Sequence, residues 1–301
     1  MTGLRWTYSD LMSYFGRTGK DHVNPIIEQL LRACPSSSVF GLGGHSVVLE
    51  LSPTIVAKVS TRAGDSRLQN EQKIFELLQQ SQCHHIVQCF FRGTDVSFLE
   101  CLADGTLHDR ISIQKPRPIL QWMFQVSAAA ACLEELGYAH GDINPQNILV
   151  DRNDELKLID FDHSLEIGAD LDVGYEPYVR QFWKPVGGVF GAAGPQTEQL
   201  ALGSVFWYML RGTELYSELD GPDQVDRLRD GVFPVVNSSD PVEKIIENCW
   251  YGRYDRVSDL VVEIKDMVGS TTTEQRGNVV GNETVEKTRN CENYYNSILS
   301  G

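Results

Sequence analysis

Hydrophobic positions divide the chain into a strand-rich first part and a helix-rich second part. In the first part, short runs of strand-forming residues separated by Gly, Ser or Pro predict five strands, over residues 39–40, 47–51, 55–59, 86–91 and 96–99. Apolar residues at helical spacing predict one helix between the third and fourth strands, over residues 66–80. Apolar positions between residues 26 and 31 predict an earlier helix that ends before Pro35. We therefore expect a small antiparallel sheet with one inserted helix.

After residue 105 the pattern becomes helical. One helix is predicted to open at Pro118 and to run to residue 135, and Gly137 is expected to form its left-handed cap. Two further apolar helices are predicted over residues 199–210 and 242–250, the first of them preceded by a glycine-rich section. The second part of the chain is therefore expected to be mostly helical.

The last thirty residues are polar. We expect them to form a flexible tail, in which four apolar residues could dock on the second part of the chain: Tyr294, Tyr295, Ile298 and Leu299. These patterns predict four segments: an N-terminal extension (1–37), a first lobe with its connection to the second (38–102), a second lobe (103–268) and the polar tail (269–301).

Composition restricts the kinds of partner. With 301 residues and 42% hydrophobic content, the chain can bury a sizeable core. The 26 basic and 41 acidic residues leave a formal net charge of −15, which argues against binding to nucleic acid or to an anionic membrane surface. The sequence shows no secretory leader and no apolar stretch of membrane-spanning length, so we expect a soluble, cytoplasmic or otherwise intracellular protein. Seven cysteines without a Cys-x-x-Cys pair favour scattered, buried thiols over a disulfide framework.

Acidic and amide residues follow two short apolar runs in the middle of the chain. Asp142 and Asn147 lie five positions apart in a loop before residues 147–150, and Asp160 follows a second run at 156–159. Transfer of a phosphoryl group to a hydroxyl needs a base and two Mg²⁺ ligands on adjoining loops. Turn chemistry alone could also explain Asp and Asn in such a loop. The two flanking strands favour the phosphoryl-transfer interpretation.

A glycine-rich hairpin is predicted between the first two strands. Gly41, Gly43, Ser46 and Val48 follow the spacing Gly-x-Gly-x-x-Gly-x-Val, with Ser46 in the place of the third glycine. Glycine-rich turns between strands are common, so this hairpin alone is a weak signal.

A lysine in an apolar strand strengthens that signal. Lys58 ends the run Ile-Val-Ala-Lys, where a buried charge needs an anionic partner. Glu71 on the following helix is the preferred partner, and Glu76 is less favoured because it lies nearer the helix end. A solvated Glu71 is the simpler alternative.

Taken together, these residues resemble the catalytic domain of eukaryotic protein kinases, and within that group the compact kinase-like proteins of filamentous fungi. The resemblance covers residues 38–265. It implies an α+β, bilobal protein-kinase-like fold, with a small five-stranded antiparallel N-lobe carrying one main helix and a mostly helical C-lobe. It also implies an enzyme that transfers the γ-phosphoryl group of MgATP to a protein hydroxyl, Ser or Thr rather than Tyr.

The resemblance assigns a role to each candidate residue. Lys58 would hold the α- and β-phosphates and pair with Glu71. Asp142 would orient the acceptor hydroxyl and accept its proton, while Asn147 and Asp160 would bind Mg²⁺.

Other roles fall on backbone groups. The glycine-rich hairpin would bind the nucleotide, and the backbone of Glu100 and Leu102 would meet adenine at the interlobe hinge. Glu198 occupies the place of the acid that anchors the catalytic-loop backbone. ATP, Mg²⁺ and a protein substrate are therefore the expected ligands.

Several positions depart from the family pattern. Gly141 replaces the usual Arg, from which we expect activity without phosphorylation of the activation segment. Asn144 replaces the usual Lys, and Asp162 stands in the place of a glycine whose left-handed conformation Asp can also adopt. The Ala-Pro-Glu element is missing, and Pro195-Gln196 is its nearest remnant.

Two other functions remain open. Small-molecule kinases related to aminoglycoside and choline phosphotransferases share the motif around Asp142 and Asp160; the paired glycines before Lys58 and the later helices argue against that alternative. The substituted motif positions also suit a noncatalytic nucleotide-binding scaffold. Retention of Lys58, Glu71, Asp142, Asn147 and Asp160 argues against the scaffold, because a protein without catalysis has no need of all five.

Overall fold

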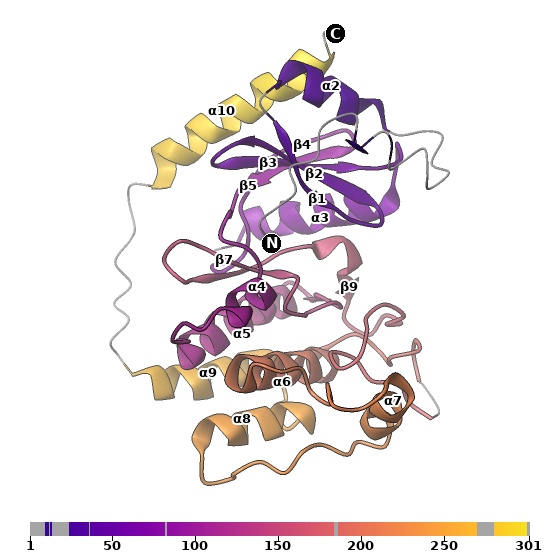
Figure 1. Ribbon diagram of the computed structural model, residues 1–301, viewed down its shortest axis with the longest axis vertical. Helices are drawn as coiled ribbons and strands as arrows, with labels where there is room; N and C mark the ends of the chain where they lie inside the picture. The colour runs from indigo at the N-terminus through magenta and orange to yellow at the C-terminus, as the bar shows by residue number, and fades with distance from the viewer. Residues whose placement is uncertain are drawn as a thin grey trace. The chain divides into compact units, whose positions relative to one another are not determined.

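A computed structural model describes most of the chain: residues 10, 11, 13, 24–35, 37–81, 83–183, 186–269 and 280–299. The chain forms two compact units (Figure 1). The first comprises Met1–Glu76, Val87–Ala103 and Glu274–Gly301, and the second comprises Leu77–Ile86 and Asp104–Thr273. The lobe limits 38–102 and 103–268 stay predictions.

The first unit is built on a five-stranded antiparallel sheet in the order β1-β2-β3-β5-β4. Its strands are β1 (Ser38–Leu42), β2 (Ser46–Ser52), β3 (Ile55–Ser60), β4 (Cys89–Gly93) and β5 (Val96–Glu100). Buried and partly buried residues alternate along β2, whereas every residue of the central strand β3 is buried. Helix α3 (Ser66–Gln79) connects β3 to the remaining strands. The fourth strand begins three residues later than predicted, because Ile86 forms a bridge with Leu158 instead.

Two helices from opposite ends of the chain complete the first unit. Helix α2 (Pro25–Ala33) begins at Asn24, whose side-chain oxygen accepts the N–H of Ile26. Helix α10 (Val280–Leu299) contacts both α2 and β4 (Figure 1). Cys291 and Ile298 of α10 are buried in the core that this sheet shares with α2.

The helix α10 corrects the expectation of a flexible tail that could dock on the second part of the chain. Tyr294 of α10 stacks on Phe98 of β5, and the hydroxyl of Tyr295 accepts the N–H of Thr94. Gly93 makes this contact possible, because a side chain there would collide with the Tyr295 ring. An apolar stripe on one face of a polar helix is sufficient to hold it on the sheet.

The second unit is mostly helical, which together with the first unit confirms the predicted α+β class. Its helices are α4 (Leu107–Ser112), α5 (Ile119–Glu135), α6 (Pro195–Arg211), α7 (Gly221–Arg229), α8 (Pro241–Trp250) and α9 (Val257–Val268). Helix α5 contacts α6 and α9, and α6 packs on α8 (Figure 1). Gly203 allows close packing on α8, since a Cβ there would lie 2.9 Å from atoms of Cys249 and Trp250. Helix α6 starts before the predicted residue 199, because Pro195 suits its first turn.

Short strands hold the loops of the second unit. Strands β7 (Ile148–Val150) and β8 (Leu156–Leu158) form one antiparallel pair, and β6 (Tyr138–Ala139) and β9 (Leu165–Glu166) form another. A 3₁₀ turn, η1 (Phe161–His163), lies between β8 and β9. The N–H of Ile159 donates to the carbonyl of Asn147 at 3.0 Å, so the loops that carry Asp142 and Asp160 lie side by side.

Two cysteines correct the expectation of unpaired thiols. Cys83 and Cys132 form a disulfide with a Cα–Cα distance of 5.9 Å. They lie 49 positions apart, so only the packing of α5 against the loop after α3 brings them together. The other five cysteines are free and buried. In the part of the chain that the structure describes, none of the helices combines the length and the apolar character needed to cross a membrane.

Candidate active site

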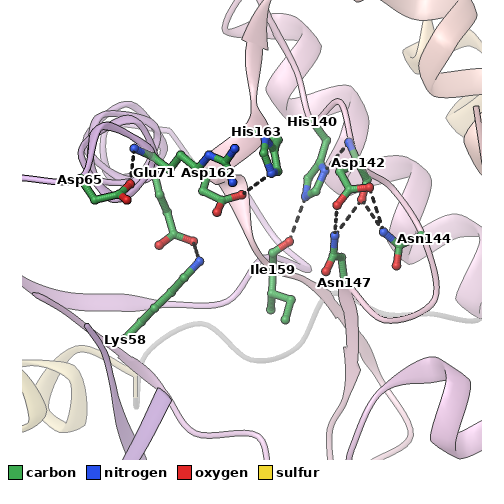
Figure 2. Close-up of polar contacts among 11 residues, drawn as sticks. Lys58, Asp65, Glu71, His140, Asp142, Asn144, Asn147, Ile159, Asp162 and His163 are labelled. Carbon is green, nitrogen blue, oxygen red and sulfur yellow. Dashed lines mark hydrogen bonds and ion pairs between the residues drawn. The ribbon is translucent and has the colours of Figure 1, made fainter. Parts of the chain in front are cut away.

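In the first unit, Lys58 and Glu71 form a buried ion pair. Lys58 lies in the middle of β3, where it pairs with Val48 of β2 and Ser97 of β5. Its Nζ atom is 2.8 Å from Oε1 of Glu71 on α3, and the two side chains are 8% and 1% exposed (Figure 2). A charge in this strand requires such a partner, because an unpaired buried ammonium is costly. The structure therefore places Lys58 beside Glu71 and not beside a solvated acid.

The glycine-rich hairpin joins β1 and β2. Gly41 pairs with Val48 in the register of the two strands, and the N–H of Gly43 donates to the carbonyl of Ser46 at 2.9 Å. A Cβ at Gly41 would lie 3.8 Å from Val48, which is an ordinary contact, so packing does not require glycine there. Without side chains at Gly41 and Gly43, a phosphate can approach the backbone of the hairpin closely.

The two hinge candidates lie at the end of β5. Glu100 is the last residue of that strand, and its N–H donates to the carbonyl of Gln88 at 2.9 Å. Leu102 follows the strand and is buried. The N–H of Cys101 between them donates to the carbonyl of Thr54. These bonds fix the backbone conformation of the segment that we expect to meet adenine.

In the second unit, two amide side chains hold the carboxylate of Asp142 (Figure 2). Nδ2 of Asn147 donates to one carboxylate oxygen at 2.8 Å, and Nδ2 of Asn144 donates to the other at 3.1 Å. Both amides also bond the Asp142 carbonyl. The side chain of Asp142 therefore has little rotational freedom, which is the condition for a positioned general base.

The environment of Asp142 also sets its proton affinity. Burial raises the pKa of its carboxyl group to about 6, and repulsion from Asp160 adds to this rise. Hydrogen bonds from Asn147 and Asn144, and the positive charge of His163, act in the opposite direction. A carboxylate with this pKa is still ionised at neutral pH and can accept a proton.

His140 supports the loop that carries Asp142. Its ring is fully buried and lies edge-on to the ring of Phe161. The Nδ1 atom accepts the N–H of Asp142 at 3.2 Å, so the ring proton lies on Nε2, which donates to the carbonyl of Ile159 at 2.9 Å (Figure 2). The ring of His140 thus connects the backbone of Asp142 to the backbone of Ile159, the residue before Asp160.

Glu198 anchors the same loop from helix α6. Its carboxylate accepts the N–H of His140 at 2.9 Å and the N–H of Gly141 at 3.2 Å. Burial raises the pKa of Glu198 to about 7, with repulsion from Glu134 and Asp142 as further causes. This is the contact that the resemblance implied for Glu198.

Two backbone conformations explain departures from the family pattern. Gly141 has φ +78°, and a Cβ there would lie 2.9 Å from the carbonyl oxygen of His163. A side chain at this position would strain the turn, so the observed loop favours glycine over the usual arginine. Asp162 was expected to adopt the left-handed conformation, but it lies in the turn η1, and Asp160 has φ +68° instead.

Asn147 and Asp160 offer oxygen ligands of the kind that Mg²⁺ prefers. Nδ2 of Asn147 is engaged by Asp142, so its amide oxygen is the atom available to a cation. The backbone bond from Ile159 to Asn147 places Asp160 next to it. This donor set fits the metal that a phosphoryl-transfer enzyme requires.

Sequence reasoning missed two supports of Asp142. The motif comparison treated Asn144 only as the replacement of a lysine, whereas its side-chain amide donates a hydrogen bond to the carboxylate of Asp142. The buried bonds of His140 were not predicted either, although a histidine directly before Gly141 and Asp142 was a visible signal. Each role depends on backbone atoms whose positions no sequence spacing reveals.

Comparison with known proteins agrees with this geometry. Residues 52–268 match the family of protein kinase domains. The rice protein "Salt tolerance receptor-like cytoplasmic kinase 1" (Oryza sativa subsp. japonica) is 27% identical over 246 residues, which cover 73% of this chain and 66% of that protein. The human "Myotonin-protein kinase" is 33% identical over 107 residues, covering 32% of this chain and 17% of that protein.

A third relative is the rice "Cyclin-dependent kinase F-4", which is 31% identical over 88 residues, or 29% of this chain and 18% of that protein. The matches thus span just under two thirds of the rice receptor-like kinase and less than one fifth of the other two relatives. Because the family match extends over well more than half of its length, the chain belongs to the protein kinase domain family.

Proposed function

We propose that this chain is an ATP-dependent protein kinase that phosphorylates Ser or Thr hydroxyls. In the reaction, the bond between the γ-phosphorus and the oxygen of ADP breaks while a bond to the acceptor oxygen forms. The acceptor hydroxyl gives its proton to Asp142. The observation that carries the proposal is the carboxylate of Asp142, which two amides orient and burial poises for proton transfer.

The remaining residues have supporting roles in this proposal. Lys58, fixed by Glu71, holds the α- and β-phosphates of ATP. Asn147 and Asp160 bind Mg²⁺, which neutralises charge on the phosphates when bound. The backbone of the hairpin at Gly41 and Gly43, and the backbone of Glu100 and Leu102, contact the rest of the nucleotide. The name of one relative, "Myotonin-protein kinase", supports a protein acceptor.

An acceptor screen tests the proposal. Purified protein is incubated with radiolabelled ATP, Mg²⁺ and either generic proteins (casein, myelin basic protein) or small alcohols (choline, an aminoglycoside). We expect label on Ser and Thr of the proteins, and at least about hundredfold less with Asp142→Asn. A matched control is Asp151→Asn, which alters a partly buried carboxylate in the turn between β7 and β8.

The other outcomes distinguish the alternatives. Label on small alcohols but on no protein would contradict the proposal in favour of a small-molecule kinase. Thermal stabilisation by MgATP without transfer to any acceptor would contradict it in favour of a nucleotide-binding scaffold. The resemblance to fungal kinase-like proteins stays a prediction, which this screen does not test.

A further inference from the structure

The second unit contains a cavity that the proposed reaction does not use. It has a volume of about 390 Å³, within the range of pockets that hold ligands. Among the described residues, its walls come from three places in the unit: residues 171–182 and 186–192, the first turns of α6, and the end of α8. Gln196, the remnant of the missing Ala-Pro-Glu element, lies in its wall together with Thr197. The departure from the family motif therefore borders this cavity.

One wall of the cavity is aromatic. Trp250 is only 2% exposed, and its ring stacks on Phe233 at a centroid distance of 5.0 Å. Its indole nitrogen has no hydrogen-bond partner among the described residues and almost no accessible surface, so a ligand in the cavity does not reach it. Trp250 therefore offers the cavity an aromatic surface against which an apolar side chain can pack.

A cation lies in the same wall. The guanidinium of Arg180 is 4.9 Å from the centroid of the Phe182 ring. Among the residues that the structure describes, no carboxylate pairs with Arg180, and none of the residues lining the cavity is acidic. Burial lowers the pKa of Arg180, so the environment does not compensate its charge. In a chain with 41 acidic residues, a cation beside an acid-free cavity favours an anionic ligand.

Exposed apolar side chains line the cavity. Val186 is 87% exposed, Phe182 is 37% exposed, and Tyr251 at the end of α8 is half exposed. All three belong to the lining of the cavity. Apolar residues gathered on a surface indicate contact with another macromolecule, because a small ligand needs only the interior of a cavity.

We propose that this cavity docks a protein partner through an acidic, apolar peptide segment. A large apolar side chain of the partner enters the cavity and packs against Trp250 in its wall. The neighbouring carboxylate of the partner pairs with Arg180. This surface belongs to one unit and is separate from the residues assigned to phosphoryl transfer, so it goes beyond the proposed function.

Binding of short peptides tests this docking site in the full chain. The probes are fluorescent ten-residue peptides of Gly and Ser with Phe-Asp, Leu-Asp or Trp-Asp at the centre. Their controls carry Phe-Asn or Ala-Asp at the same place. We expect the tightest of the three to bind at least about tenfold more strongly than either control. The Phe-Asn control lacks the ion pair, and the Ala-Asp control lacks the large apolar side chain.

Two variants locate the binding. Arg180→Met should lower the affinity of the acidic peptide about tenfold and leave the affinity of the Phe-Asn peptide unchanged, because only the acidic peptide offers a carboxylate. Arg152→Met, at an exposed position outside the cavity, is the matched control and should change neither. Ala192→Trp fills the cavity from an exposed position and should abolish binding of every peptide.

The indole signal of Trp250 gives an independent measurement. In protein labelled with ¹⁵N at tryptophan, the Trp250 indole N–H should shift when the peptide is added, and the signal is assigned with Trp250→Phe. Equal binding of acidic and control peptides, or an unmoved Trp250 signal, would overturn the proposal. So would phenylacetate binding as tightly as the peptide, because the site would then take a small carboxylate and not a protein.

Discussion

At the scale of single residues, the buried carboxyl group of Glu198 holds the loop that carries Asp142. Glu198 accepts two backbone N–H groups from the loop while fully buried in α6. Burial disfavours its charged form more strongly than the two bonds favour it, so its pKa rises from 4.5 to about 7. The protonation of a residue that touches no substrate can therefore alter the stability of the loop.

Glu198 predicts a specific pH dependence of stability. Because the folded pKa lies above the ordinary value, this group contributes stability at low pH that is lost as the pH rises from about 4.5 through about 7. Glu198→Gln is uncharged at every pH and lacks this contribution. The difference in free energy of unfolding, wild type minus variant, should fall by on the order of 3 kcal/mol between pH 5 and pH 8.

Urea unfolding of both proteins at pH 5, 6, 7 and 8 measures this difference. Other titrating groups are shared by the two proteins and cancel, apart from Glu134 and Asp142, whose charges act on Glu198. A difference that stays constant over this range would contradict the assigned pKa.

Gly141 predicts a second effect at the residue scale. Gly141→Ala should lower the free energy of unfolding by about 2–4 kcal/mol, because the left-handed conformation is strained and the Cβ would approach the His163 carbonyl. Gly168→Ala is the matched control: it has φ +93° but no atom within 4 Å of the new Cβ, so it should cost only about 1–2 kcal/mol. Equal losses in thermal or urea unfolding would exclude the contact with His163.

At the scale of elements, helix α10 is the largest difference between expectation and structure. It is mostly polar, and its few apolar residues lie in one stripe, so composition indicated a tail. The stripe meets an apolar sheet surface that is built by residues about 200 positions away, as in the contact between Thr94 and Tyr295. A sequence gives no distance between such segments, and this is why the docking was missed.

Adjacent residues of α10 provide a matched test of the docking. Ile298 is 3% exposed and Leu299 is 68% exposed. Ile298→Ala should lower the free energy of unfolding by about 2–4 kcal/mol, whereas Leu299→Ala should change it by less than about 0.5 kcal/mol. Chemical denaturation of the two variants measures both values, and equal effects would show that the helix does not pack in this way.

Other elements were predictable because their signals are local. Proline at the start and glycine after the end bounded α5, and short apolar runs between turn residues gave the five strands. In the site, Lys58 and Glu71 were paired correctly because a lysine in a buried strand has few possible partners. The amide bonds to Asp142 and the left-handed Asp160 depend on tertiary geometry, which spacing alone does not provide.

At the scale of the whole molecule, the candidate residues are divided between the two compact units. Lys58 and Glu71 belong to the first, and Asp142, Asn147 and Asp160 belong to the second. If the chain is a kinase, transfer should require residues from each unit, whereas unfolding stability should depend on each unit's own core.

The most direct measurement is the rate of γ-phosphoryl transfer from MgATP to a protein acceptor, determined for the wild type, Asp142→Asn and Lys58→Met. We predict that Asp142→Asn lowers the rate about 10²–10⁴-fold while the affinity for MgATP stays within about twofold, because the amide has nearly the size of the carboxylate but accepts no proton. Lys58→Met should lower the transfer rate and weaken the affinity for MgATP. Unchanged transfer in Asp142→Asn would contradict the account.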